Sequence, residues 1–166
     1  MIPKMKVSDA YFSPDRKHRY WLIRIWDDKL PVMANIGANP STADEIKNDR
    51  TVSKDIGFAQ RLCYGGLLKL NVGGFRATKP QDWYQASDPF GPKNTPKDFI
   101  RYIEQFNAKI VVAAWGEVIG PFAYAGERIR VAIPELWCFG CTANGSPRHT
   151  CRIPYDTPLE PYGMAR

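Results

Sequence analysis

The chain has 166 residues, a length typical of a single domain, and we expect one domain over residues 1–166. Its 23 Lys and Arg residues outnumber its 17 Asp and Glu residues, and the resulting net charge of +6 favours phosphate-containing partners. The sequence has no run of about 18 apolar residues and no apolar core near its start, which argues against a membrane span and a secretory leader. We therefore expect a soluble, cytoplasmic protein with no membrane partner and with its four cysteines reduced.

Two strands are predicted first along the chain. The segment RYWLIRIWD, residues 19–27, is rich in aromatic and β-branched side chains with partial alternation. A polar turn at residues 27–29 separates it from the apolar segment PVMANIG, residues 31–37. We expect these two strands to be adjacent.

A helix and a third strand follow. Apolar residues recur every three or four positions after Thr51, which predicts a helix; they are Val52, Ile56, Ala59 and Cys63. The tripeptide YGG then ends the helix, because glycine disfavours helix continuation. The segment LLKLNVG, residues 67–73, predicts a short buried strand.

Residues 73–98 predict a long ordered loop, since their glycines and prolines are mixed with Trp and Phe, which linkers rarely contain. Thr95 as cap and Pro96 at the first position predict a helix. Its expected buried face comprises Phe99, Tyr102, Ile103 and Phe106. The remaining predicted elements are a strand at 109–116, a helix from about 117 to 125 and a strand at 135–140.

This alternation of strands and helices predicts an α/β fold, a three-layer sandwich around a mostly parallel sheet of four or five strands. Ligands of such sheets bind at the carboxyl ends of the strands. Those ends carry GANPST, NVGGFRAT, AAWGE and CFGCTANGSPRH, and we expect them to converge on one cleft. The candidate substrate-binding residues are Gly37, Pro40, Ser41, Asp44, Asn71, Phe75, Arg76, Asn94, Trp115, Gly145 and Arg148.

Polar residues after the second strand form the first candidate group. The Asn39 amide can hold a water or a base edge, although an Asn-Pro pair also suits a plain turn. Asp44, Glu45 and Asp49 can act as general bases or hold Mg²⁺, and the alternative is capping of the following helix. For Asp49, two residues before Thr51, capping is the favoured interpretation.

Basic and aromatic residues in the long loop form the second group. Arg76 follows two glycines at a strand end, where a guanidinium can reach a phosphate; a surface salt bridge is the alternative. Phe75, Trp83, Tyr84 and Phe90 accompany it, and aromatic residues among cations suit base stacking as well as loop packing.

The third group lies near the end of the chain. His149 follows Arg148 in a polar turn, where it can act as a general acid or donate to a developing oxyanion, whereas His18 is predicted at the surface. Cys138, Cys141, His149 and Cys151 form C-x2-C-x7-H-x-C, a ligand set that a tetrahedral zinc could use, although its second half departs from common zinc motifs and Cys138 in a strand also suits a small apolar filler. We expect no bound metal and no cofactor.

Taken in order, these segments resemble a family known as domain of unknown function 1643, found in bacteria and their phages. The resemblance rests on RYWLIRIWD, NPSTADEIKNDRT, FAQRLCYGGLLKLNVGGFRAT, PFGPKN, VVAAWG and CFGCTANGSPRHTCRIP with PLEPY, nearly the whole chain. The chain departs from the family at Asp49-Arg50-Thr51, where Asp-Pro-Thr is usual, and at His149-Thr150-Cys151, where His-Pro-Leu is usual.

Two turns are also similar to turns of uracil-DNA glycosylases, which are α/β sandwiches with a site at the strand ends. GANPS resembles the GINPG turn of the mismatch-specific branch, and RHTC resembles the HPS turn. The resemblance implies that Asn39 orients the attacking water, that His149 stabilises negative charge on the leaving base, and that Phe75 or Trp115 stacks on that base.

Three functional hypotheses follow. The first is a glycosylase-like protein that hydrolyses or recognises a modified or mismatched base in nucleic acid, with Asn39, His149 and Asp49 as catalytic residues. The second is a non-catalytic binder of a nucleotide or modified base, acting in phage defence or counter-defence. The third is a metal-dependent nucleotide hydrolase that uses Asp44 and Asp49.

Overall fold

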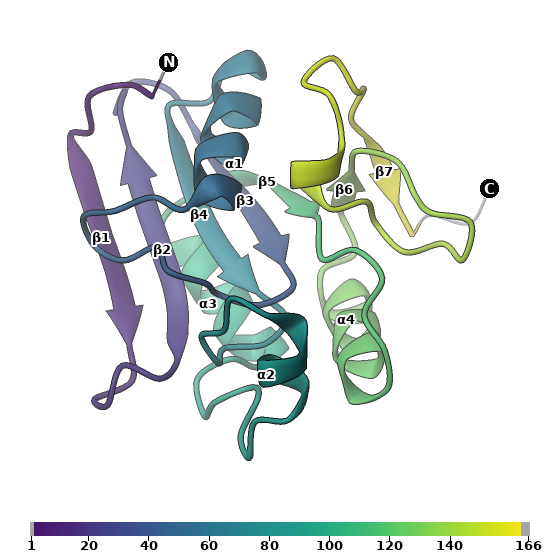
Figure 1. Ribbon diagram of the computed structural model, residues 1–166. Coiled ribbons are helices and arrows are strands. Elements are labelled where there is room, and N and C mark those ends of the chain that lie inside the picture. Colours follow the sequence, from purple (N-terminus) through teal and green to yellow (C-terminus); the bar gives the residue numbers. More distant parts are fainter. Residues whose placement is uncertain (1, 164–166) are drawn as a thin grey trace.

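Seven strands form a single sheet in the computed structural model, which describes residues 2–163 (Figure 1). In chain order they are β1 (Val7–Phe12), β2 (Arg19–Ile25), β3 (Val32–Gly37), β4 (Gly66–Asn71), β5 (Ala108–Ala113), β6 (Leu136–Cys138) and β7 (Glu160–Tyr162). Across the sheet their order is β1-β2-β4-β3-β5-β6-β7. Residues 1 and 164–166 of the predicted domain lie outside the described residues.

The α/β class is confirmed, but the sheet is mixed and not mostly parallel. β4, β3, β5 and β6 pair in parallel at the centre. β1 with β2, β2 with β4 and β6 with β7 pair antiparallel. β4 lies between β2 and β3, so the expectation that the segments 19–27 and 31–37 form neighbouring strands is wrong. The chain leaves β3, passes through the helix at residues 50–61 and returns as β4 on the side of β3 that faces β2.

Four α-helices and a 3-10 turn connect the strands of the described chain. They are α1 (Arg50–Arg61), α2 (Pro80–Tyr84), α3 (Pro96–Gln105), α4 (Pro121–Ala132) and η1 (Thr150–Arg152). The expected cap of α3 is confirmed, since Thr95 and Asp98 form a reciprocal capping box. α4 begins four residues later than predicted, because Gly120 has a positive φ of 55° and Pro121 occupies the first helical position.

Helices cover both faces of the sheet (Figure 1), and each face buries its own apolar core. Alternate strand residues point to opposite faces, so neighbouring residues such as Leu67 and Leu68 belong to different cores. Val52 and Ile56 of α1 pack with Leu67 on one face. The other face is covered by α3 and α4, whose core side chains are Phe99, Tyr102 and Ile129.

The segment of residues 38–49, which follows β3, is held by two buried arginines of β2. Arg19 donates a 2.9 Å hydrogen bond to the Ala43 carbonyl, and Arg24 donates a 2.8 Å hydrogen bond to Asn48 Oδ1. Burial lowers the pKa of Arg19 to about 10, so its guanidinium is still charged at neutral pH. The turn that carries Asn39 is therefore anchored to the sheet.

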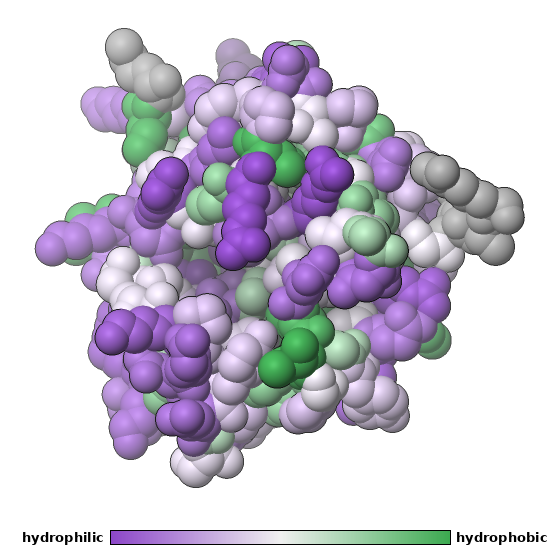
Figure 2. All heavy atoms as spheres, turned by 45° about the vertical axis from the view of Figure 1, so that its right-hand side comes forward, coloured by the Kyte–Doolittle hydropathy of each residue, from purple (hydrophilic) through white to green (hydrophobic). Residues whose placement is uncertain are grey.

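Hydrophilic side chains predominate on the face drawn in Figure 2, and the hydrophobic ones form small separate groups. Large exposed apolar side chains such as Ile46, Ile119 and Val131 come from different segments of the chain. Within residues 2–163, no helix combines the length and the apolar character needed to cross a membrane.

Candidate functional site

A cleft of about 610 Å³ opens at the carboxyl ends of β3 and β5. Three of the four predicted strand-end segments line it, those after β3, β5 and β6, whereas NVGGFRAT after β4 does not. The start of α1 and the short α2 complete its wall. The lining residues used below are Asn39, Thr51, Tyr84, Trp115, Arg148 and His149.

Asn39 lies in the turn after β3 with its side chain fixed by the neighbouring loop. Asn39 Nδ2 donates a 2.8 Å hydrogen bond to the Ala77 carbonyl, and the Ala77 amide donates in turn to the Pro40 carbonyl at 2.9 Å. Within the described chain, Asn39 Oδ1 accepts no hydrogen bond, so it is free to hold a water or a ligand donor. Pro40 itself does not line the cleft.

His149 caps the 3-10 turn η1, which also lines the cleft. Its Nδ1 accepts a 3.2 Å hydrogen bond from the Cys151 amide, which assigns the proton of the neutral ring to Nε2. Burial lowers the pKa of His149 below its ordinary value of 6.5, and the nearby Lys69 ammonium lowers it further. At neutral pH His149 is therefore an uncharged ring with an Nε2–H that can donate to a ligand.

A buried polar cluster lies on the α1 side of the sheet and influences His149. Lys69 Nζ of β4 is 2.8 Å from Asp55 Oδ2 of α1, and the two side chains are 2% and 0% exposed. Lys69 also donates to Asn35 Oδ1 of β3. Gly37 borders this cluster, because a Cβ there would lie 2.7 Å from Lys69 Nζ. Gly37 itself does not line the cleft, and its lack of a side chain leaves room for the Lys69 ammonium.

Sequence reasoning missed Lys69 and Asp55. The signal was present, because a lysine between leucines in LLKLN cannot be buried in a strand without a partner of opposite charge. Asp55 stands one residue before Ile56, on the face of α1 that packs on the sheet. Recognising the pair needed the spatial pairing of α1 with β4, which spacing alone does not reveal.

Three aromatic residues, Trp83, Tyr84 and Trp115, line the cleft. Trp83 and Trp115 are only 1% and 5% exposed, so little ring surface is left for stacking. Tyr84 is half-buried, and its ring lies 5.1 Å from that of Trp83 and 4.8 Å from that of Phe122. Of these three residues, Tyr84 therefore has the most ring surface available to a ligand.

The rim of the cleft carries both charges. Arg148 and Arg152 are exposed, as is Glu117. Arg148 Nε donates a 3.2 Å hydrogen bond to the Cys141 carbonyl, which fixes the arginine stem. Two cations and one anion leave a net positive rim, suited to a phosphate-bearing ligand.

Three of the predicted substrate-binding residues gather outside this cleft. Ser41, Phe75 and Arg76 line a separate surface depression. Arg76 Nε donates to the Ser41 carbonyl at 3.3 Å, so the guanidinium braces two loops. Phe75 packs edge-on against His18 at 5.7 Å between ring centroids. His18 is 8% exposed and donates to the Asp88 carbonyl at 2.7 Å, so its predicted surface position is wrong.

The other predicted residues have contacts of a structural kind. Asn71 is buried and accepts from Arg19 at 3.1 Å, and Asn94 Nδ2 donates to the carbonyls of Asn71 and Val72. Asp44 Oδ1 accepts from the amides of residues 46 and 47 in its own turn. Gly145, with φ of 81°, lines a different depression beside β7.

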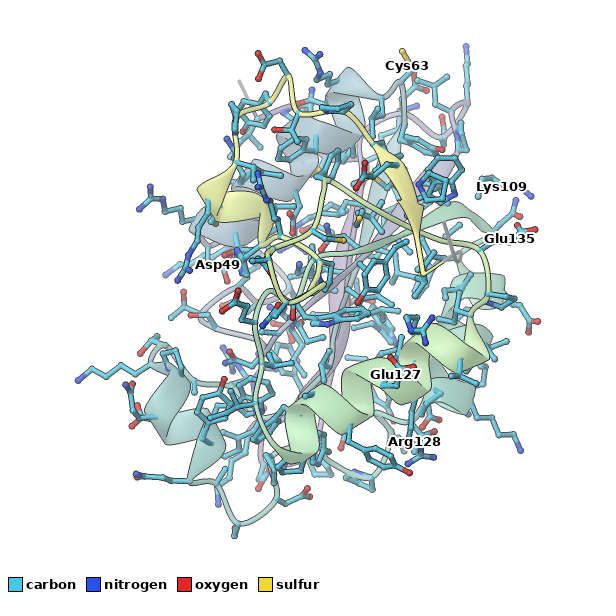
Figure 3. All side chains as sticks on the ribbon, turned by 90° about the vertical axis from the view of Figure 1, so that its right-hand side faces the viewer. Asp49, Cys63, Lys109, Glu127, Arg128 and Glu135 are labelled. Carbon is cyan, nitrogen blue, oxygen red and sulfur yellow. The ribbon has the colours of Figure 1, made fainter. Side chains whose placement is uncertain are left out.

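Asp49 caps α1, as the favoured interpretation predicted, since its Oδ1 accepts a 2.8 Å hydrogen bond from the Val52 amide. Figure 3 shows Asp49 near the C-terminal loop, but it does not line the cleft. We expect Asp49→Ala to lower the free energy of unfolding by about 1 kcal/mol, measured by urea denaturation. Asp49→Ser keeps a capping oxygen and is expected to restore most of this loss. An equal loss in both variants would contradict the capping role.

The four residues of the candidate zinc pattern C-x2-C-x7-H-x-C do not come together, since the only members grouped closely enough for one ion within residues 2–163 are Cys138 and Cys141. Cys138 Sγ and Cys141 Sγ are 3.8 Å apart. Cys151 lies instead beside Thr51 at the cleft, with 3.2 Å between Sγ and Oγ1, and His149 Nδ1 faces the Cys151 amide.

One protein-family model matches the chain, over residues 19–150, and its description reads "Protein of unknown function (DUF1643)". No curated protein and no solved structure matches. The matched range begins at β2 and ends just after His149, so it contains Asn39, His149 and the buried Lys69–Asp55 pair. Because this range is most of the 166 residues, the chain belongs to the DUF1643 family.

Proposed function

We propose that the protein binds a modified or mismatched nucleobase of a nucleic acid in this cleft and hydrolyses its N-glycosidic bond. The observation that carries the proposal is that Asn39 and His149, far apart in sequence, line one cleft. These are the two residues that the glycosylase-like turns single out. The resemblance to uracil-DNA glycosylases implies that the GANPS and RHTC turns lie at one site.

The chemistry available in the cleft suits this reaction. Asn39 Oδ1 accepts from a water and aims its oxygen at C1′ of the sugar. The C1′–N bond breaks as the C1′–O bond forms, and the base departs with negative charge on its carbonyl oxygen. His149 Nε2–H donates to that oxygen, while the proton lost by the water passes to the departing base or to solvent. Tyr84 supplies ring surface against the base.

The architecture supports a uracil-DNA glycosylase-like sandwich at its centre. Four parallel strands with helices on both faces present the cleft at their carboxyl ends (Figure 1). The antiparallel strands β1, β2 and β7 are additions at the two edges of this central part. We propose that the parallel centre is the part related to the glycosylases.

Base release tests the proposal directly. The purified protein is incubated with single- and double-stranded oligonucleotides that carry uracil, hypoxanthine or a hydroxymethylated base, and free base is measured by mass spectrometry. We expect release of one of these bases, and its loss in Asn39→Ala. Absence of release from a folded protein whose melting temperature the oligonucleotide raises would favour the non-catalytic binder instead.

The charged rim gives a prediction about binding. We expect Arg148→Ala to weaken oligonucleotide binding and to reduce the slope of log affinity against log salt concentration by about 1, because one phosphate contact is lost. Fluorescence anisotropy at several salt concentrations measures both quantities. Arg128 lies on α4 away from the cleft (Figure 3), so Arg128→Ala removes an equal charge as control. Equal effects of the two substitutions would show that only net charge matters.

A further inference from the structure

A second site lies between the end of β6 and the start of β7, apart from the cleft. Cys138 and Glu160 are directly opposed in the antiparallel pairing of these strands. Cys141 follows three residues later, after a turn in which Gly140 has φ of 83°. One ligand atom from each of Cys138, Cys141 and Glu160 lies within 4.8 Å of the other two.

We propose that Cys138, Cys141 and Glu160 bind a thiophilic divalent cation of the zinc class. The Sγ atoms of Cys138 and Cys141 are 3.8 Å apart. Two thiolates at about 2.3 Å from one zinc, with a tetrahedral angle between the bonds, lie roughly 3.8 Å apart. The two sulfurs therefore already have the separation that a shared zinc requires, and C-x2-C is a common spacing of such ligands.

The carboxylate of Glu160 also favours a cation at this site. Within residues 2–163, the Glu160 carboxylate has no ion pair, and the Arg130 guanidinium, which lines the same depression, pairs with Glu127 and donates to the Gly163 carbonyl. A bound divalent cation would pair with the Glu160 carboxylate and stabilise both cysteines as thiolates, with release of their protons.

The surroundings leave room for a fourth ligand. Cys138 is buried, whereas Cys141 and Glu160 are partly exposed. Cys141 and Glu160 also line a depression of about 610 Å³ next to β7, from which water can complete a tetrahedron. The Cys141 carbonyl accepts from Arg148, so the cation would brace the loop that leads to the cleft.

Cobalt titration of the reduced, chelator-treated full chain tests this site. We expect one Co²⁺ per chain, a sulfur-to-cobalt charge-transfer band in the near ultraviolet, and displacement of Co²⁺ by Zn²⁺ with a rise in melting temperature. Cys141→Ser is expected to abolish the tight site, and Glu160→Gln to weaken affinity at least tenfold while the band remains. Cys151→Ser and Cys63→Ser serve as matched controls and are expected to leave titration and band unchanged.

Three results would overturn the proposal. One is the absence of a charge-transfer band at stoichiometric Co²⁺ while all four thiols react with a thiol reagent. Another is a band that survives Cys141→Ser but is lost in Cys151→Ser, because the metal would then lie at the cleft. The third is rapid formation of a Cys138–Cys141 disulfide even in the presence of Zn²⁺, which would make the pair a redox couple.

Discussion

Replacing Lys69 with methionine is expected to lower the free energy of unfolding by about 3–5 kcal/mol, because the substitution leaves the buried Asp55 carboxylate without its partner. Neither side chain reaches water, since they are 2% and 0% exposed, so solvent cannot replace the lost ammonium. Asn35 also loses the donor that its Oδ1 accepts from. Urea denaturation followed by tryptophan fluorescence and circular dichroism measures the change.

Two controls separate this effect from a loss of packing. The double variant Lys69→Met with Asp55→Leu removes both charges and is expected to recover most of the stability, because a buried ion pair can be replaced by apolar side chains. Lys109 is an exposed lysine of β5 (Figure 3), and Lys109→Met is expected to change the free energy by at most about 0.5 kcal/mol. If the double variant is as unstable as Lys69→Met alone, the lowered free energy of unfolding does not come from the broken ion pair.

Much of the secondary structure was predictable because its signals are local. The spacing of Val52, Ile56 and Ala59 marks the buried face of α1, and Thr95-Pro96 marks the start of α3. The edge strands β1 and β7 were not predicted, because half-exposed strands with one partner lack a strong apolar alternation. The position of β4 between β2 and β3 depends on long-range pairing, which no local pattern records.

The candidate site was predictable in the same limited way. A polar turn after a buried strand indicates the edge where a site can form, and Asn39, Trp115 and His149, which follow such strands, line one cleft. A polar turn after a strand does not predict in which direction the following loop folds. Arg76 turns toward the Ser41 carbonyl and Asn94 toward the end of β4, so both hold loops together outside the cleft.

Removal of the His149 side chain is expected to lower the rate of base release by roughly 10²–10³-fold, the usual effect of losing one donor to a developing oxyanion. His149→Ala removes the Nε2–H, and His149→Asn keeps an amide donor on a shorter side chain, so we expect the asparagine variant to be the more active. Single-turnover kinetics with saturating enzyme measures the chemical step without product release. Equal activity of His149→Ala and the native protein would exclude His149 from the reaction.

The pH dependence follows from the lowered pKa of His149. Burial, Lys69 and Arg152 favour the neutral ring, against the opposing Asp55 and Asp49 carboxylates, so the folded pKa lies below 6.5. Between about pH 6.5 and the folded pKa of His149, the unfolded chain binds more protons than the folded chain. The contribution of His149 to stability therefore declines as the pH is lowered through this range and changes no further below the folded pKa. Protonation also places a hydrogen on Nδ1 opposite the Cys151 amide, which removes the acceptor of their hydrogen bond. We expect activity to be level from about pH 7 to 8 and to fall where the folded His149 becomes protonated, at a lower pH than that at which stability begins to decline, and the His149→Asn variant to lack this step in urea-denaturation free energy. An acid step of the same size in both proteins would assign it to another group.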